Sequence, residues 1–348
     1  MRLSTCCRDA NEAVHRYIRS TLDVNRLLRP FFTNAVAFRN LQARAGMLIS
    51  GSAVLQFFLR IRRTDSTLVL YIYVDQLPDV TQWLLQAGYR LLIHEFRVST
   101  TFSSSPDVSR FRNSPGLLSQ AVNTLTFKRK GASTTINVVS SPCLSPIQMI
   151  LLSRSTGMLN LVTQDMAYCM YPRATLEGRC SLLLQCEAPA QQATKEDDRI
   201  PDLQYIASAH QSGSMLTFRF GQSRWLNDRN SWSVPLDTIL VTVPCQDDGI
   251  QFTSWRLMEA PQIRLAYEAI TYPCFRRTYI VGDPTIRAMC TLFMLMYNAV
   301  LRSHGLFCTF DQDIQHFIVQ FASSDRDKDL HVAEILDVRY LGQLFCSV

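Results

Sequence analysis

Residues 47–75 read MLISGSAVLQFFLRIRRTDSTLVLYIYVD, and this stretch decides which fold we expect. The apolar run at 47–50 predicts a short buried strand, and the Gly51-Ser52 pair after it predicts a turn. Residues 53–61 have apolar side chains at helical spacing, which indicates a helix packed on one side. Residues 67–75 are rich in β-branched and aromatic side chains, so they predict a central strand. The stretch therefore predicts a strand–turn–helix–strand unit.

Three sequence motifs extend this unit along the chain. They are Leu48–Ser52 with Leu55-Gln56-Phe57-Phe58, Trp83-Leu84-Leu85 with Gly88-Tyr89, and Ala167-Tyr168 through Tyr171-Pro172-Arg173-Ala174-Thr175 to Glu177. With these motifs the chain resembles, over roughly residues 20–180, a group of uncharacterised fungal proteins found mainly in basidiomycetes. The Gly-Ser turn between strand and helix, before a strand that bears acids in that group, is similar to the nucleotidyltransferase fold. The resemblance implies an α+β protein with a nucleotidyltransferase-like mixed sheet flanked by helices.

The resemblance also implies where such an enzyme would hold its metal ion. In nucleotidyltransferases the Gly-Ser turn lets backbone amides approach phosphates, so Gly51 and Ser52 are a candidate, vestigial phosphate turn. Two carboxylates at i and i+2 on the next strand share one face and bind Mg²⁺. The aligned positions here are Thr67 and Val69, and the candidate third position holds Asn137. Because Mg²⁺ prefers charged oxygen ligands, we expect no catalytic residues, no metal ligands and no cofactor.

Two aspartates near this strand leave another interpretation open. Asp65 and Asp75 share side-chain parity with Thr67 and Val69, but Asp75 lies six residues beyond Val69. That separation is roughly 20 Å along a strand, which is too far for the two aspartates to share one ion. Three interpretations remain: a degenerate and catalytically silent fold, an active Mg²⁺-dependent enzyme with relocated ligands, and a chance resemblance with an ordinary Gly-Ser turn.

The rest of the chain predicts further elements and a second unit. We expect domains at 1–186 and 214–348, the second a smaller α+β unit, joined by an acidic polar linker at 187–213. A capping box at Asp9 and Glu12 starts the first predicted helix. Helices are predicted at about 9–28, 34–44, 79–88, from 146, from about 164, 284–303 and 331–345. Strands are predicted as a hairpin at 124–130 and 134–140, and then at 214–221, 237–243 and 250–256. A mobile loop is predicted at 99–116.

Charge is distributed unevenly along the chain. The net charge of +6 combines about +11 in residues 1–186 with about −5 in residues 187–348. A basic N-terminal half could attract a phosphate-rich ligand or nucleic acid, although it could equally pair with the acidic half. The basic clusters are Arg60, Arg62 and Arg63, and Lys128, Arg129 and Lys130. Neither has aromatic residues between its charges for base stacking, so a solvated rim is favoured over a nucleic-acid patch.

Other candidate sites are weak. The eleven cysteines are scattered without a C-x-x-C pair, and the six histidines lack zinc or catalytic spacing. No phosphate-binding loop of the P-loop or dinucleotide type occurs. Arg224, Trp225, Asp228 and Trp232 could form a pocket, but a structural turn is favoured.

The sequence also bears on location. The longest apolar stretch, 288–301, is too short to span a membrane, and the first residues lack the apolar run of a secretory signal. We expect an intracellular protein, cytoplasmic or nuclear, with no membrane partner. The leading functional hypothesis is a catalytically silent binding or interaction module. The alternatives are a divalent-metal-dependent nucleotidyltransferase and a basic nucleic-acid-binding module.

Overall fold

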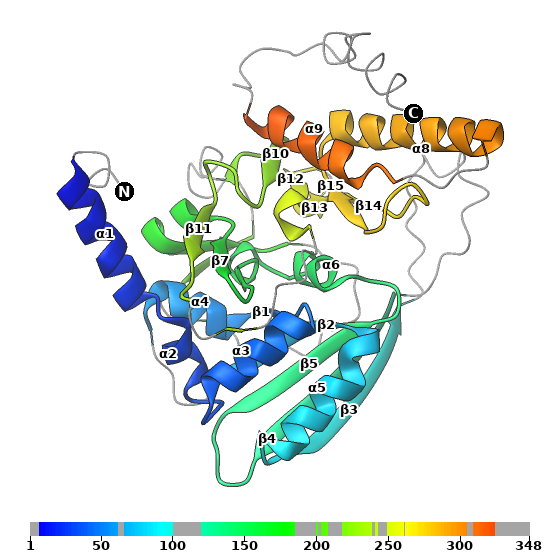
Figure 1. Cartoon of the computed structure of the whole chain (residues 1–348). Helices are drawn as coiled ribbons and strands as arrows, with labels where there is room; N and C mark the ends of the chain where they lie inside the picture. Colours follow the sequence, from blue (N-terminus) through cyan, green and yellow to red (C-terminus); the bar gives the residue numbers. More distant parts are fainter. Residues whose placement is uncertain are drawn as a thin grey trace. The chain divides into compact units, whose positions relative to one another are not determined.

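The computed structural model describes residues 7–61, 66–99, 120–184, 200, 203–207, 218–238, 241–242, 249–260, 262–304 and 309–323. The chain divides into two compact units, one of residues 1–251 and 256–266 and the other of residues 252–255 and 267–348. The predicted α+β class is confirmed, because helices flank a large mixed sheet (Figure 1). In the part of the chain described, no helix is both long and apolar enough to cross a bilayer.

The first unit is built on an eight-stranded sheet. Its strands follow the order β11-β7-β6-β1-β2-β5-β4-β3. Their bounds are β1 Leu48–Ser50, β2 Thr67–Tyr73, β3 Tyr89–Ser99, β4 Gln120–Arg129, β5 Thr135–Ser141, β6 Leu161–Val162, β7 Met166–Cys169 and β11 Trp232–Pro235. Strands β2 and β5 pair in parallel, and every other neighbouring pair in this sheet is antiparallel. The predicted hairpin at 124–130 and 134–140 is confirmed as β4 and β5.

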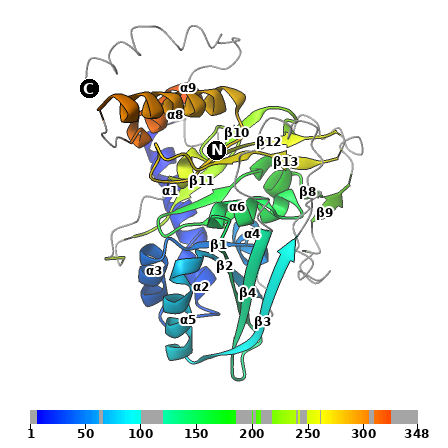
Figure 2. The same ribbon diagram turned by 90° about the vertical axis from the view of Figure 1, so that its right-hand side faces the viewer.

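Helices cover the two faces of this sheet. They are α2 Val24–Leu28, α3 Ala35–Arg44, α4 Ser52–Leu59, α5 Leu77–Gln86 and α6 Pro146–Leu151, while α1 Arg8–Thr21 precedes them in the chain and contributes the partly buried Ile18 to the main core. On β2, Leu68, Leu70 and Ile72 are fully buried, and they belong to the main core together with side chains from α2 to α5. Figure 2 shows α3 and α5 beside each other, away from α6. The other face of β2 packs in part against Met149 of α6.

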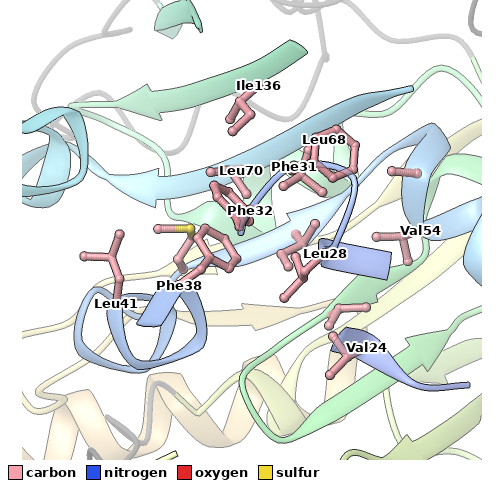
Figure 3. Close-up of a cluster of buried hydrophobic side chains, with 14 of the residues drawn as sticks. Val24, Leu28, Phe31, Phe32, Phe38, Leu41, Val54, Leu68, Leu70 and Ile136 are labelled. Carbon is pink, nitrogen blue, oxygen red and sulfur yellow. The ribbon is translucent and has the colours of Figure 1, made fainter. Parts of the chain in front are cut away.

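The main core explains why the sheet and helices hold together. Phe32 and Phe38 stack with ring centres 4.1 Å apart, and both are almost completely buried. Figure 3 shows these rings in one cluster with Leu70 and Ile136 of the sheet. Because each large side chain removes its apolar surface from water here, this cluster is the main source of stability in the first unit.

Some predicted elements differ from the structure. The helix predicted at 9–28 is broken into α1 and α2, because the Asp23 side chain accepts a hydrogen bond from Asn25 N and starts a new helix. The helix predicted from about Gln164 is wrong, because β6 and β7 form a hairpin there. In its turn, Thr163 Oγ1 accepts a hydrogen bond from Met166 N at 2.9 Å. The strands predicted at 214–221 and 237–243 are wrong in their described residues, which contain no strand.

Several shorter elements lie outside the large sheet. A π-helix spans Arg173–Glu177, and 3₁₀ helices span Val74–Gln76 (η2), Thr156–Met158 and Ile250–Phe252. Strands β8 (Cys180–Leu182) and β9 (Gln204–Ile206) pair in parallel. A three-stranded sheet contains β10 (Ser223–Trp225), β12 (Ser254–Met258) and β13 (Arg264–Ala266), so the strand predicted at 250–256 is confirmed only in its second half.

The second unit is smaller. It contains the antiparallel pair β14 (Glu268–Ile270) and β15 (Tyr279–Val281), then α8 (Pro284–His304) and α9 (Asp311–Ser323). The helix predicted at 284–303 is confirmed as α8. At the start of α9, the Asp311 carboxylate accepts hydrogen bonds from Arg276 N at 2.9 Å and Tyr279 Oη at 3.1 Å. These bonds connect α9 to β15, and burial raises the pKa of Tyr279, which therefore stays a donor.

The predicted linker at 187–213 lies mostly outside the described residues, as do the helix at 331–345 and nearly all of the loop at 99–116. Strand β11 follows that linker in the sequence. It nevertheless pairs with β7 through four residue pairs, from Trp232 with Cys169 to Pro235 with Met166. This segment of the predicted C-terminal domain therefore belongs to the large sheet, because its backbone completes the hydrogen bonding of that edge.

Candidate functional site

The turn at Gly51 connects β1 to α4. Gly51 has φ +85° and ψ −160°, a conformation that only glycine adopts without strain. Leu55 N donates to Gly51 O at 3.1 Å, which closes the first turn of α4. The backbone N–H groups that open a helix have no partner inside it, and the half-buried Gly51 at the N-cap of α4 provides no side-chain cap for them. The local geometry is compatible with the predicted phosphate turn.

Strand β2 brings the sequence-predicted positions next to this turn. Val69 pairs with Ser50 on β1 and with Asn137 on β5. Residues paired across neighbouring strands point to the same face, so these three side chains form one row. Thr67 lies on the same face, where its Oγ1 is 2.9 Å from Thr135 Oγ1. The structure thus brings together the aligned positions Thr67, Val69 and Asn137.

This row does not offer the ligands that Mg²⁺ requires. Val69 packs its methyl groups, with Tyr71, against the apolar side chains of Val122, Val139 and Met149. The remaining donors, Thr67 and Asn137, are neutral, and Asn137 Oδ1 is buried without a hydrogen-bond partner among the described residues. Because a hydroxyl and an amide cannot replace two carboxylates, these residues do not fit a magnesium ion.

Of the two alternative acids, the described Asp75 does not complete a site either. Asp75 lies in η2 after β2 ends, is exposed, and accepts a hydrogen bond from Gln76 Nε2 at 3.1 Å. Asp65 lies outside the described residues. Where side chains are described, no group of three or more His, Cys, Asp or Glu residues could hold a metal ion.

The basic cluster at 128–130 is divided between the two faces of the sheet. Lys128 pairs with Thr135 on the face of Thr67, whereas the neighbouring Arg129 points to the opposite face because side chains alternate along a strand. Arg129 donates to Ala87 O at 3.1 Å, and its guanidinium lies 4.8 Å from the ring centre of Tyr89. In the other cluster, Arg60 donates to Tyr17 Oη at 2.8 Å. Arg62 and Arg63 lie outside the described residues.

The segment from Arg224 to Trp232 forms a structural turn. Arg224 is 2% exposed, and its Nε lies 2.5 Å from Asp228 Oδ2. The Asp228 carboxylate also accepts from Trp225 N at 3.2 Å and Asn230 N at 2.8 Å. Trp232 packs elsewhere, with its ring centre 5.8 Å from that of Phe58. The side chains of Arg224, Asp228 and Ser231 therefore bond within the turn, as a structural role requires.

The described histidines and cysteines have ordinary environments. His94 Nε2 lies 2.6 Å from Asn123 Oδ1, and His316 Nε2 lies 2.8 Å from Gln320 Nε2. The side chains of the other four histidines, 15, 210, 304 and 331, are outside the described set. Burial raises the pKa of Cys169 to about 12 and that of Cys290 to about 12, so both thiols stay protonated. A protonated, buried thiol is a poor nucleophile.

One feature could not be predicted from linear patterns. A hollow of about 250 Å³ is lined by residues from the loop before α3, from α5 and from β4, namely Phe32, Thr33, Asn34, Trp83, Gln86, Ala87 and Arg129. These residues come from three distant segments, so no spacing rule connects them.

No protein-family model matches the chain, and no curated protein matches it.

Proposed function

We propose that this chain is a catalytically silent protein of nucleotidyltransferase-like fold that acts as a binding or interaction module. The observation that supports it is the close approach of Gly51 to Val69, an apolar residue at a position where an active enzyme would have a carboxylate. A Cβ atom on Gly51 would lie 3.2 Å from Cγ2 of Val69. The position beside the turn, where an active enzyme needs a carboxylate, therefore holds a hydrocarbon side chain that packs into a cluster.

Ligand-dependent thermal stability tests this proposal directly. The full chain is mixed with each common nucleoside triphosphate, alone and with Mg²⁺ or Mn²⁺, and the melting temperature is measured. We expect no additional stabilisation from the metal, since a bound ligand stabilises only in proportion to its affinity for the folded state. A metal-dependent rise in melting temperature, or release of pyrophosphate, would instead favour an enzyme with relocated ligands.

A double substitution tests whether β2 is the equivalent of the metal-binding strand. The variant Thr67→Asp/Val69→Asp restores two carboxylates on one face, and Thr67→Asn/Val69→Asn is the uncharged control. We expect the aspartate variant to bind Mn²⁺ at least about tenfold more tightly than the control in calorimetry, because Mn²⁺ prefers charged oxygens. If the folded aspartate variant binds no more Mn²⁺ than the control, the resemblance of β2 to that strand is coincidental.

The alternative of a phosphate-rich or nucleic-acid ligand predicts a different result. Binding through basic residues weakens steeply with salt because counterions are released. Retention on an RNA or DNA column that is lost as salt rises would support it. In the described part of the cluster at 128–130, however, Lys128 and Arg129 lie on opposite faces of the sheet, so they do not form one continuous basic patch. We therefore expect weak retention.

A further inference from the structure

The hollow beside α5 combines an apolar wall with one charged group. Phe32 and Trp83 form the wall, with ring centres 5.6 Å apart in an edge-on arrangement. Phe32 is only 2% exposed, whereas Trp83 is half-buried. Phe32 therefore backs the wall from the core, and Trp83 supplies its accessible aromatic surface, which suits a flat aromatic ligand.

Arg129 is the charged residue of the hollow. One nitrogen donates to Ala87 O at 3.1 Å, and the Tyr89 ring supports the guanidinium plane at 4.8 Å from its centre. These two contacts hold the group in one orientation. Its other N–H groups have no partner within the described part of the chain, and no acidic side chain lines the hollow there. A fixed guanidinium with spare donors binds a carboxylate through charge-assisted hydrogen bonds.

The rim adds polar groups around this cation. Thr33, Asn34 and Gln86 are exposed at the mouth, and Asn34 Oδ1 already accepts from Ala37 N at 2.9 Å at the start of α3. The positive end of the α3 dipole therefore lies on the same side as Arg129. Both features favour a negative charge in the hollow, and neither involves Gly51 or β2.

We propose that this hollow binds a small aromatic carboxylate, with its ring against the half-buried Trp83 and its carboxylate on Arg129. The volume of about 250 Å³ sets the size of the ligand. It equals the space of about eight water molecules and is below the usual range for drug-sized ligands. A single-ring acid fits this space, and a nucleotide exceeds it. The proposal is independent of the proposed function, because the hollow lies on the sheet face opposite Thr67.

Calorimetric titration with benzoate tests the proposal, with benzamide as the neutral ligand of the same shape. We expect benzoate to bind the full chain in the millimolar range and at least about tenfold more tightly than benzamide. Arg129→Gln should abolish this preference. Arg90→Gln is the matched control, since Arg90 is exposed on the other face and should leave benzoate binding unchanged.

A second variant separates binding from folding, because Arg129 also supports Ala87 and Tyr89. Gln86→Glu places a negative charge on the rim without touching those contacts, and should weaken benzoate binding several-fold at an unchanged melting temperature. Equal affinity for benzoate and benzamide, no measurable binding of either, or normal benzoate affinity in a folded Gln86→Glu protein would each overturn the proposal.

Discussion

Gly51 and Val69 approach so closely that a Cβ atom on the glycine would lie 3.2 Å from Cγ2 of the valine. The same glycine has φ +85° and ψ −160°, so it is constrained both by its backbone and by its neighbour. This contact connects the turn before α4 to the middle of β2. It makes the turn sensitive to any substitution at either residue.

The variant Gly51→Ala should lower the free energy of unfolding by about 1–3 kcal/mol, because alanine is strained at this φ and crowds Val69. Gly88→Ala is the matched control, since Gly88 has φ +86° and nothing within 4 Å of an added Cβ. Urea unfolding of both variants should show the larger loss for Gly51→Ala. Equal losses would mean that the contact with Val69 contributes nothing.

Truncating a phenylalanine to alanine should lower the free energy of unfolding strongly where the ring is buried and hardly at all where it is exposed. Phe38→Ala removes a fully buried ring that stacks on Phe32 at 4.1 Å, and should cost about 3–5 kcal/mol. Phe96→Ala removes a ring that is 63% exposed on β3, and should change stability by less than about 0.5 kcal/mol. Chemical denaturation of the two variants measures the difference, and a small loss for Phe38→Ala would contradict the packing described here.

The buried ion pair at the 224–232 turn should not tolerate the loss of one partner. Asp228→Ala leaves the guanidinium of Arg224 buried without its carboxylate, and should destabilise the protein by about 3–5 kcal/mol. Asp75→Ala, at an exposed carboxylate, is the control and should have little effect. If thermal unfolding gave similar melting temperatures for both variants, the turn would not be stabilised by this pair.

Alkaline pH should destabilise the fold through Cys169. Its thiol titrates near pH 9.0 when unfolded, whereas burial raises the pKa to about 12 in the folded protein. The unfolded chain therefore releases this proton first, so the stability present below pH 9 is lost as the pH rises towards 12. The loss from this group is at most about 1.4 kcal/mol per pH unit.

The pH dependence is measured by urea unfolding between neutral and alkaline pH. The Cys169→Ala variant should lose stability less steeply than the unmodified chain, because its buried titrating group is absent. The exposed Cys7 serves as the comparison, and Cys7→Ala should keep the original slope. Identical slopes in all three proteins would show that Cys169 does not contribute.

Local sequence was enough to predict the elements whose signals are short-range. The β-branched and aromatic content of β2 and the close spacing of the two strands in the hairpin at 124–130 and 134–140 act over a few residues, so both elements were predicted correctly. The prediction failed near Gln164 because a hairpin closed by the Thr163 hydroxyl competes with an apolar run that resembles a helix. Strand β3, Tyr89–Ser99, was not predicted because pairing with β4 determines its conformation.

In the candidate site, too, some features follow from local sequence and others depend on the folded chain. The lack of metal-binding carboxylates at Thr67 and Val69 could be predicted from the sequence, because metal binding depends first on which side chains are present. Their position beside Gly51 and Asn137 depends on the register of β1, β2 and β5. The hollow around Arg129 depends on three segments that meet only after folding.

By itself, the amino-acid order determined the α+β class, the turn at Gly51 and the absence of carboxylates at the two aligned positions, since each follows from side chains and their close neighbours. Only the tertiary structure decided that Lys128 and Arg129 lie on opposite faces of the sheet, that β11 pairs with the large sheet, and that Arg129 and Trp83 line the same hollow. The reason is that contacts between distant residues depend on the free energy of the whole packed chain, which no local pattern encodes.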